Sequence, residues 1–313
     1  MAVLTGDVGG TKTHLCWARS PSEILAERRY DSQAYRGLGE ILQEFCQEFA
    51  VTATVAVLGI AGPVRRQCSH LTNLGWDLVG ETLAQTLGMP VHLLNDLEAA
   101  AYGVLTLTPP EWVVLQEGTP ELQAPIALVG AGTGLGTGYL TWQGDRYRAY
   151  PAEGGHLSLA PQTDAEIELL RYLRSRHGRV SGERVVSGAG LTNLYTFLQA
   201  QAGQSETPLP PAAIQARAPQ DDLAHQALVW FTRYYGRIAG DLALALLPRG
   251  GVYLTGGIPP KMLPWLTDGT FLNGFLDKGR LREVLTEIPV RVVLAENVGL
   301  RGAIAYAQGL DLG

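Results

Sequence analysis

The chain alternates short apolar runs with longer segments in which apolar residues recur every three or four positions. Short runs bounded by glycine, asparagine or proline indicate buried strands, whereas the longer period is typical of amphipathic helices. The predicted strands cover residues 2–4, 54–60, 91–94, 126–129, 252–255 and 290–294. The predicted helices cover residues 38–49, 78–87, 96–105, 163–177, 191–202, 223–247 and 299–307. This alternation predicts an α/β protein with a largely parallel or mixed sheet.

Two stretches rich in proline, glutamine or alanine interrupt the alternation. Residues 106–111 read TLTPPE and predict a hinge between two α/β blocks, and residues 203–222 predict a surface loop. Residues 3–15 and 126–140 share one pattern, a strand followed by a Gly/Thr turn and a second strand. This shared pattern indicates a faint internal duplication.

Composition and charge narrow the class of partner. The 313 residues are 46% hydrophobic and 17% charged, as in a globular protein, and a length of about 150 residues per domain predicts two domains. The net charge is 24 − 30 = −6, and no run of five like charges occurs. This charge distribution argues against nucleic acid or an anionic membrane as a partner and favours small ligands.

The three cysteines are widely separated, which disfavours a disulfide framework or a cysteine-based zinc site. The first residues show no basic and apolar leader, and no stretch approaches 18 uninterrupted apolar residues, so a soluble cytoplasmic protein is expected. Glycine is abundant, with 38 residues, and its clusters lie between apolar runs. Such clusters indicate turns in which the backbone approaches another group closely.

The first glycine-rich motif follows the first predicted strand. Paired glycines let a hairpin turn direct backbone N–H groups at an anion, a threonine adds a hydroxyl, and an aspartate can hold Mg²⁺ or its waters. An ordinary Gly-rich hairpin is the alternative, and the standard P-loop is not matched because no Gly-Lys pair occurs. The predicted phosphate-binding residues are Gly6, Asp7, Val8, Gly9, Gly10 and Thr11, with Asp7 as the Mg²⁺ ligand.

Two further glycine motifs follow predicted strands. Residues 130–138 read GAGTGLGTG, but no register gives GxGxxG, so a second phosphate-binding hairpin is favoured over a dinucleotide site. Its predicted ligand-binding residues are Gly132, Thr133, Gly134 and Gly136. Gly256 and Gly257 leave room for an adenine ring or a ribose against bare backbone, with a plain βα turn as the alternative.

Polar residues form two more candidate groups. Asn95 and Asp96 end a strand where a helix begins; either is a natural helix N-cap, but a carboxylate at this edge of a sheet can also be a general base for a hydroxyl group. Glu153, His156 and Glu183 offer several hydrogen-bonding groups that could converge on a polyol. Zinc is the competing interpretation of Glu153 and His156, although HExxH and a cysteine partner are absent.

Taken together, these motifs resemble the bacterial glucokinase family of the hexokinase, actin and Hsp70 superfamily. GDVGGT, NLGW, LLND, GAGTGLG, EGGH, SGERVVSG and TGGI occur in the family's order between Gly6 and Gly257. Lys12 follows the first motif, as in the related repressor and sugar-kinase (ROK) family. The cysteine-rich zinc motif of that family is missing after EGGH, where the chain reads LSLAP, so the resemblance favours the non-ROK group.

The resemblance implies a two-domain actin-like ATPase (ribonuclease H-like) fold with an interdomain cleft. Residues 1–109 plus about 296–313 would form the small domain, and residues 110–295 the large one. The glycine motifs at 6–11 and 132–136 would hold the phosphates of ATP, with Mg²⁺. The implied glucose-binding residues are Asn95, Asp96, Glu153, His156 and Glu183, and Asp96 is the implied catalytic base. Members of the family are commonly homodimers.

The expected activity is a glycolytic one, the transfer of phosphate from ATP to glucose to give glucose 6-phosphate. A kinase for mannose or fructose, or one that uses polyphosphate, is the alternative within the enzyme class. A sugar-sensing regulator without catalysis is the alternative outside it. A transcriptional regulator of this kind needs an appended DNA-binding domain, and the phosphate motif already starts at Gly6, so we expect an enzyme.

Overall fold

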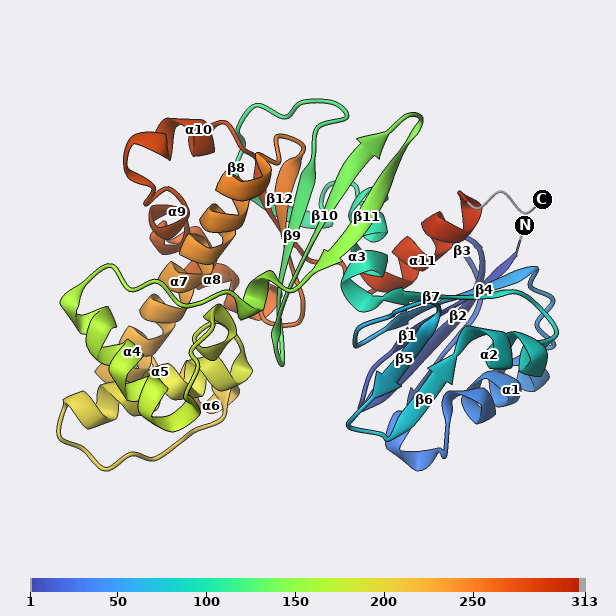
Figure 1. The fold of residues 1–313 in the computed structure, drawn as a ribbon, viewed down its shortest axis with the longest axis horizontal. Helices are drawn as coiled ribbons and strands as arrows, with labels where there is room; N and C mark the ends of the chain where they lie inside the picture. Colours follow the sequence, from blue (N-terminus) through green and yellow to red (C-terminus); the bar gives the residue numbers. More distant parts are fainter. Residues whose placement is uncertain (1, 310–313) are drawn as a thin grey trace. The chain divides into compact units, whose positions relative to one another are not determined.

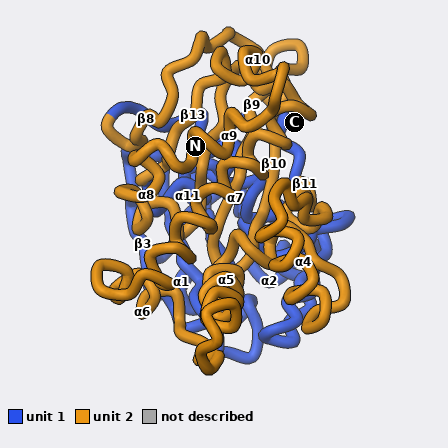
Figure 2. Tube along the Cα trace, turned by 90° about the vertical axis from the view of Figure 1, so that its left-hand side faces the viewer, with its two compact units in different colours: residues 1–109, 148–151, 295–313 blue, residues 110–147, 152–294 orange. Residues whose placement is uncertain are grey.

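The computed structural model of the chain describes residues 2–309 (Figure 1). The chain divides into two compact units, coloured in Figure 2. The first unit comprises Met1–Pro109, Arg148–Pro151 and Ala295–Gly313, and the second Pro110–Tyr147 and Ala152–Leu294. The first boundary lies inside the segment expected to be a hinge. The predicted small domain runs to residue 313, of which residues 310–313 lie outside the described part.

The first unit is built on a five-stranded sheet in the order β3-β2-β1-β4-β7. Its strands are β1 (Val3–Val8), β2 (Lys12–Ser20), β3 (Glu23–Asp31), β4 (Val55–Ile60) and β7 (Val91–Asn95). Strands β1, β4 and β7 are parallel, whereas β2 and β3 pair antiparallel. Every residue of β4 is buried, as expected for an apolar strand covered on both faces.

Helices cover both faces of this sheet because alternate residues of its strands are apolar on each side. The helices are α1 (Leu38–Glu48), α2 (Gly80–Leu87), α3 (Asp96–Val104) and α11 (Val298–Gln308). A hairpin of β5 (Cys68–Leu71) and β6 (Trp76–Val79) connects β4 to α2. Leu4 and Leu58 face the core formed with α1 and α2. Val3 and Val57 face the core formed with α3 and α11.

The second unit contains a six-stranded sheet in the order β11-β10-β9-β12-β13-β8. Its strands are β8 (Trp112–Gln116), β9 (Ile126–Ala131), β10 (Leu135–Gln143), β11 (Arg146–Ala152), β12 (Gly251–Thr255) and β13 (Val290–Val293). Its helices are α4 (Asp164–His177), α5 (Gly188–Gln201), α6 (Pro211–Arg217), α7 (Asp222–Leu246), α8 (Leu263–Thr267), α9 (Thr270–Phe275) and α10 (Arg282–Thr286). The fully buried Tyr235 of α7 joins helix to sheet, because its hydroxyl donates to the Val129 carbonyl at 2.8 Å.

The predicted α/β alternation is confirmed. Each predicted strand lies in one of β1, β4, β7, β9, β12 and β13, and the shared strand-turn-strand pattern forms the antiparallel pairs β1–β2 and β9–β10. Five strands, β3, β5, β6, β8 and β11, had no predicted counterpart. β3 shows why: seven of its nine residues are exposed and five are charged, so this edge strand lacks a buried apolar run.

Two predictions about local structure were wrong. The segment 203–222 was expected to be a loop, but it contains α6, which begins at Pro211 and buries Ile214. Proline suits the first position of a helix, where its missing N–H has no intrahelical partner anyway. The helix predicted at 78–87 begins only at Gly80, because β6 extends to Val79 and pairs with β5.

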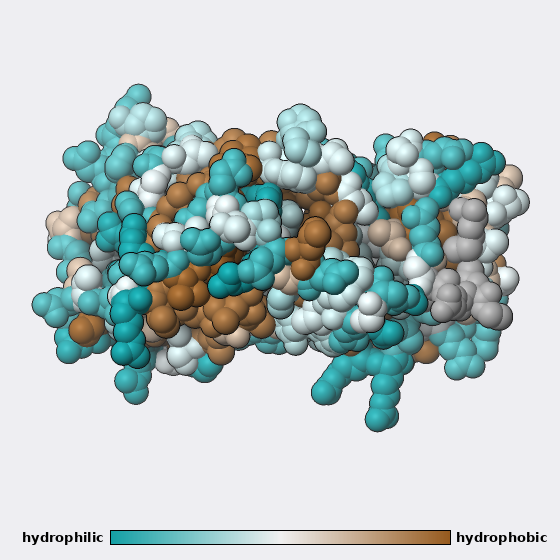
Figure 3. Space-filling model, turned by 90° about the horizontal axis from the view of Figure 1, so that it is seen from above, coloured by the Kyte–Doolittle hydropathy of each residue, from teal (hydrophilic) through white to brown (hydrophobic). Residues whose placement is uncertain are grey.

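On the face drawn in Figure 3, hydrophobic residues gather in patches among polar ones. The longest helix, α7, places charged residues such as Arg237 and Asp241 among its apolar ones. Within residues 2–309, no helix is long and apolar enough to cross a membrane.

Helices α3 and α11 of the first unit lie in backbone contact, side by side in Figure 1. A Cβ atom on Gly302 would lie 1.7 Å from the Ala99 carbonyl oxygen, and one on Gly103 would lie 1.9 Å from the Val298 oxygen. Only glycine fits at these two positions. Because Asp96 is the first residue of α3, this contact also fixes where its carboxylate lies.

We expect Gly302→Ala to lower the free energy of unfolding by about 1–3 kcal/mol, because the added methyl group forces the two helices apart. Gly299→Ala in the same helix is the matched control, since nothing lies within 4 Å of its Cβ position. That variant should be unchanged or up to about 1 kcal/mol more stable. Denaturant unfolding of the full chain measures both, and equal effects would contradict the backbone contact.

Candidate functional site

The first unit gathers polar residues at the carboxyl ends of β1, β4 and β7. Asp7 lies opposite Gly59 on β4, and Ile60 of β4 lies opposite Asn95 on β7. Asp7 and Asn95 are therefore two strand spacings apart, about 10 Å. Gly59 lets the start of α3 approach β4 closely: a Cβ there would lie 3.2 Å from the Ala99 Cβ and 3.9 Å from the Asp96 Cα.

The glycine turn after β1 is held by a serine that the sequence did not reveal. The Gly9 N–H donates to the Lys12 carbonyl at 3.0 Å, which closes the turn. The Ser32 hydroxyl donates to the Gly9 carbonyl at 2.9 Å and lies 3.0 Å from the Thr13 hydroxyl. Asn73 of the NLGW motif lies beneath the turn, with its Cβ 3.4 Å from the Cβ position of Gly10.

Asn95 is the N-cap of α3, which is the structural role that the sequence offered as an alternative. Its Oδ1 accepts from the Leu97 N–H at 3.0 Å, and its Nδ2 donates to the Gly62 carbonyl at 3.0 Å. Glu98 completes a capping box by accepting from the Asn95 N–H. These bonds hold the start of α3 rigidly, and capping by Asn95 leaves Asp96 at the first helical position.

Asp96 has the electrostatic properties of a general base. Burial raises the pKa of its carboxyl to about 6, and the nearby Asp7 carboxylate adds to the rise, whereas the Leu97 N–H, which donates to Oδ1 at 2.8 Å, opposes it. The pKa of Asp7 is also raised by the protein around it, although solvent reaches its side chain. A carboxylate with a pKa near 6 is ionised at neutral pH yet basic enough to accept a proton.

In the second unit, the predicted Gly/Thr turn follows β9 and contacts three other segments. The Gly188 N–H at the start of α5 donates to the Gly132 carbonyl at 2.9 Å, and the Ile258 N–H donates to the Ala131 carbonyl at 3.1 Å. Gly256 has a φ of +93°, and a Cβ there would lie 2.4 Å from the Ala131 oxygen. The glycines predicted at 132–136 and 256–257 thus lie together at the carboxyl ends of β9 and β12.

Glu183 packs against this turn from η3 (Gly182–Arg184). Its Oε2 accepts from the Leu135 N–H at 3.0 Å. The same oxygen would lie 2.6 Å from a Cβ on Gly134, so the turn needs glycine at that position for Glu183 to approach. Glu183 is therefore oriented by the second glycine turn.

Glu153 and His156 lie on and beside η2 (Gly154–His156), with their polar atoms 3.8 Å apart. Both side chains are open to solvent, at 80% and 54% exposure, and can accept a ligand. The intervening glycines are required by packing, since a Cβ on Gly155 would lie 1.8 Å from the Leu135 oxygen. The Gly182 N–H donates to the Leu157 carbonyl at 3.0 Å, which brings η2 and η3 together.

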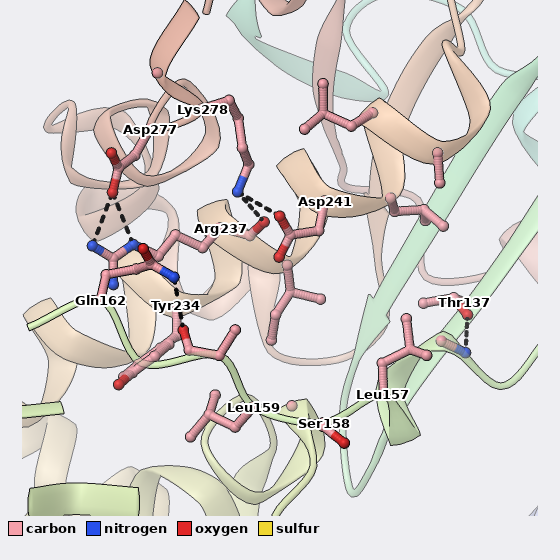
Figure 4. Close-up of a pocket in the computed structure, with 18 residues that line it drawn as sticks. Thr137, Leu157, Ser158, Leu159, Gln162, Tyr234, Arg237, Asp241, Asp277 and Lys278 are labelled. Atoms are coloured by element: carbon pink, nitrogen blue, oxygen red, sulfur yellow. Dashed lines mark hydrogen bonds and ion pairs between the residues drawn. The ribbon is translucent and has the colours of Figure 1, made fainter. Parts of the chain in front are cut away.

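A cavity of about 520 Å³ lies behind η2, between that turn and α7 (Figure 4). The Thr137 hydroxyl accepts from the Gly154 N–H at 2.8 Å and donates to the Ala152 carbonyl, which anchors the turn to β10. Arg237 donates to the buried Glu166 at 2.5 Å, and Glu166 accepts from the Gln162 N–H. This network ties residues 157–162, which follow η2, to α7. The cavity therefore lies among the contacts that hold η2 in place.

The structure places the predicted site residues in two groups. The residues at 6–11, Asn95 and Asp96 form one group in the first unit. The residues at 132–136, Glu153, His156, Glu183, Gly256 and Gly257 form the other in the second unit. Ser32 holds the glycine turn of the first group and Thr137 holds η2 in the second. The sequence analysis identified neither as a site residue. Thr137 lies inside the second glycine motif, which is a signal, whereas nothing in the sequence marks Ser32.

Comparisons of family, sequence and structure all find glucokinases among the proteins that this chain is similar to. A family model described as Glucokinase matches residues 4–310. The glucokinase of Nostoc sp. is 41% identical and covers 98% of this chain and 99% of its own. A glucokinase structure from an Antarctic psychrotroph matches with a TM-score of 0.90 at 30% identity and covers 99% of both chains. A ROK family glucokinase from Streptomyces griseus, solved with glucose and AMPPNP, matches with a TM-score of 0.66 at 20% identity over 99% of this chain and 100% of its own.

The mixed α/β fold and the glycine turns at the carboxyl ends of its parallel strands define a kinase whose structural relatives act on sugars. The chain belongs to the glucokinase family. The resemblance that the sequence motifs indicated is thereby confirmed.

We expect Asp96 to make the stability of the metal-free protein fall as the pH rises from about 4 to about 6. The pKa of Asp96 is about 6 in the folded protein, against an ordinary value of 3.8, so the folded state binds its proton more tightly. This contribution is fully present below the ordinary pKa and is lost as the pH rises through the folded pKa. Denaturant unfolding of the wild type and Asp96→Asn across this range measures the difference.

The wild type should lose stability relative to Asp96→Asn up to about pH 6 and remain parallel to it above about pH 7. Glu81→Gln removes an exposed carboxylate of the same unit and is the control. A difference between wild type and Asp96→Asn that does not change with pH would show that the pKa of Asp96 is ordinary.

Proposed function

We propose that this protein transfers the γ-phosphoryl group of ATP to the 6-hydroxyl group of D-glucose, giving glucose 6-phosphate and ADP. The observation that carries the proposal is the position of Asp96. Its carboxylate, with a pKa of about 6, stands at the start of α3 beside a glycine turn suited to phosphate. Membership of the glucokinase family supports glucose and ATP as the substrates.

In this mechanism Asp96 accepts the proton of the 6-hydroxyl as that oxygen attacks the γ-phosphorus in line with the departing ADP oxygen. The Leu97 N–H bond to Oδ1 orients the carboxylate. The backbone N–H groups of the two glycine turns offset the charge of the phosphates. We assign ATP contacts to residues 6–11, 132–136 and 256–257.

Glucose in this proposal is held by Asn95, Asp96, Glu153, His156 and Glu183. The two units would then be the small and large domains of an actin-like fold that face each other across a cleft. Closure of such a cleft excludes water, a smaller nucleophile than glucose, from the phosphate. The proposal also includes a cytoplasmic location and a homodimer, of which the homodimer rests on the family resemblance.

Asp7 fits a role in holding Mg²⁺. Its carboxylate is accessible to solvent, and its raised pKa reflects partial loss of hydration that a cation would offset. Mg²⁺ bound with a nucleotide needs only one or two carboxylates, because phosphate oxygens and waters complete its shell. When bound, the ion neutralises charge on the phosphate oxygens.

A coupled assay of phosphorylated sugar tests the activity. We expect the highest kcat/KM with glucose and ATP, and lower values with mannose, fructose or polyphosphate. Asp96→Asn should bind glucose but lose about 10²- to 10⁴-fold or more in kcat, because an amide cannot accept the proton. Glu81→Gln serves as the control and should keep wild-type kcat. A near wild-type kcat for Asp96→Asn would remove that residue from the role.

The sugar contacts are tested separately from the nucleotide contacts. Glu153→Gln and His156→Ala should raise the KM for glucose about 5- to 150-fold, because each leaves a sugar hydroxyl without its partner. The KM for ATP should change much less. His70→Ala, which removes an exposed histidine of the first unit, is the control. An equal rise in the KM for ATP would assign η2 to the nucleotide instead.

A further inference from the structure

A second cavity, of about 500 Å³, lies in the second unit at the amino ends of β9 and β12. Ile126, the first residue of β9, and Gly250, which precedes β12, both line it. The glycine turn at 132–136 follows the other end of β9. Six residues of strand separate the two ends by about 20 Å, so this cavity is distinct from the candidate active site.

Arg291 of β13 lines this cavity with donors that lack acceptors. Its Nε is buried without a hydrogen-bond partner, and Nη1 reaches only the Tyr253 hydroxyl, at 3.4 Å. Among the described residues, no carboxylate forms an ion pair with it. A guanidinium carries five N–H donors in a planar fork that matches phosphate or carboxylate oxygens. The arginine is thus charged, with one buried donor unpaired and a second in a long hydrogen bond.

Three structural features hold the Arg291 guanidinium in place. The register of β13 with β8 shifts between Val290 and Arg291, and such a bulge redirects the side chain that follows it. Gly251 has a φ of +123°, and a Cβ there would lie 3.0 Å from Nη1, so bare backbone makes room for the group. The guanidinium carbon lies 5.6 Å from the Tyr253 ring centre and 5.7 Å from that of Trp112.

Aromatic side chains form another wall of the cavity. The rings of Trp142 and Tyr147 meet edge to face with centres 5.2 Å apart. The Trp142 Nε1 donates to the Gly144 carbonyl at 3.1 Å, and the Tyr147 hydroxyl donates to the Ala124 carbonyl at 3.0 Å. These bonds fix both rings. Trp142 of β10 and Tyr147 of β11 flank the β10–β11 turn. This turn and the β8–β9 loop, which contains Ala124, lie at the same end of the sheet, at the top in Figure 1.

The charge balance of the cavity favours an anion. Glu121 also lines it, but its carboxylate is paired with Arg249 at 2.6 Å, and this pair has no net charge. Arg291 supplies the one remaining charge among the lining residues. A fixed guanidinium beside flat, immobile rings suits a ligand with an oxyanion on a ring-shaped body. A phosphate ester meets both requirements and carries up to two charges.

We propose that this cavity binds an organic phosphate ester, with the phosphate on Arg291 and the ring body against Trp142 and Tyr147. A sugar phosphate and a nucleoside monophosphate share this chemistry, because the C–H face of a sugar and a purine ring both pack on aromatic rings. The inference stands apart from the proposed function, since none of these residues belongs to the candidate active site.

Calorimetric titration of the full chain tests the proposal, with glucose and AMPPNP present at saturation to fill the active site. Glucose 6-phosphate, AMP and inorganic phosphate are titrated separately. We expect at least one ester to bind at one molecule per chain and more tightly than inorganic phosphate. Arg291→Met should weaken this binding about 10- to 100-fold, because charge-assisted hydrogen bonds are lost. Arg282→Met, which removes an exposed arginine of the same unit, should not.

Trp142→Leu provides a second variant that keeps the arginine. It should weaken binding of the ester at least fivefold and leave binding of inorganic phosphate unchanged. Phosphorylation of glucose by all three variants should match the wild type, which shows that they fold. The proposal is overturned if neither ester binds, if inorganic phosphate binds as tightly as both, or if Arg291→Met and Trp142→Leu keep wild-type affinity.

Discussion

Backbone contact between α3 and α11 is the constraint on which the first unit's site depends. Side chains normally keep helix axes 8–10 Å apart, but Gly103 and Gly302 have none, so each helix meets the other's carbonyl groups directly. The C-terminal helix thereby buttresses the helix that begins with Asp96. Asp96, the proposed base, is positioned by residues about 200 positions away in the chain, and burial at that position raises its pKa.

In the second unit too, glycines without side chains let neighbouring segments pack closely. Gly155 lets η2 pack onto β10, and Gly134 lets Glu183 reach the turn that follows β9. A hydroxyl then secures each glycine turn: Ser32 on the first, and Thr137 on the segment beside the second. Polar side chains such as Glu153 and His156 can remain exposed because the backbone beneath them is tightly held.

The candidate site poses an electrostatic problem that its backbone helps to solve. The chain is acidic overall, and its candidate ligands include Asp7, Asp96, Glu153 and Glu183. In the proposed function, the phosphates of ATP must nevertheless bind near carboxylates such as Asp7. Turns rich in glycine direct N–H groups outward, and a divalent cation can offset the rest. The Arg291 cavity differs in kind, since a single unpaired cation with aromatic neighbours needs no such compensation.

The sequence by itself determined the α/β class, the buried strands and the family. Buried parallel strands such as β4 are continuous apolar runs, and glycine motifs at their ends are local in the chain, so both can be read from one segment at a time. The edge strand β3 and the short helix α6 were not predicted. Each is recognised by the segments that it packs against, and its own residues carry no clear apolar pattern. Only the tertiary structure revealed Ser32 against Gly9, Gly302 against Ala99, and Gly251 beneath Arg291. Each joins segments distant in sequence, and a contact between such segments depends on how the chain folds, which no local pattern of residues encodes.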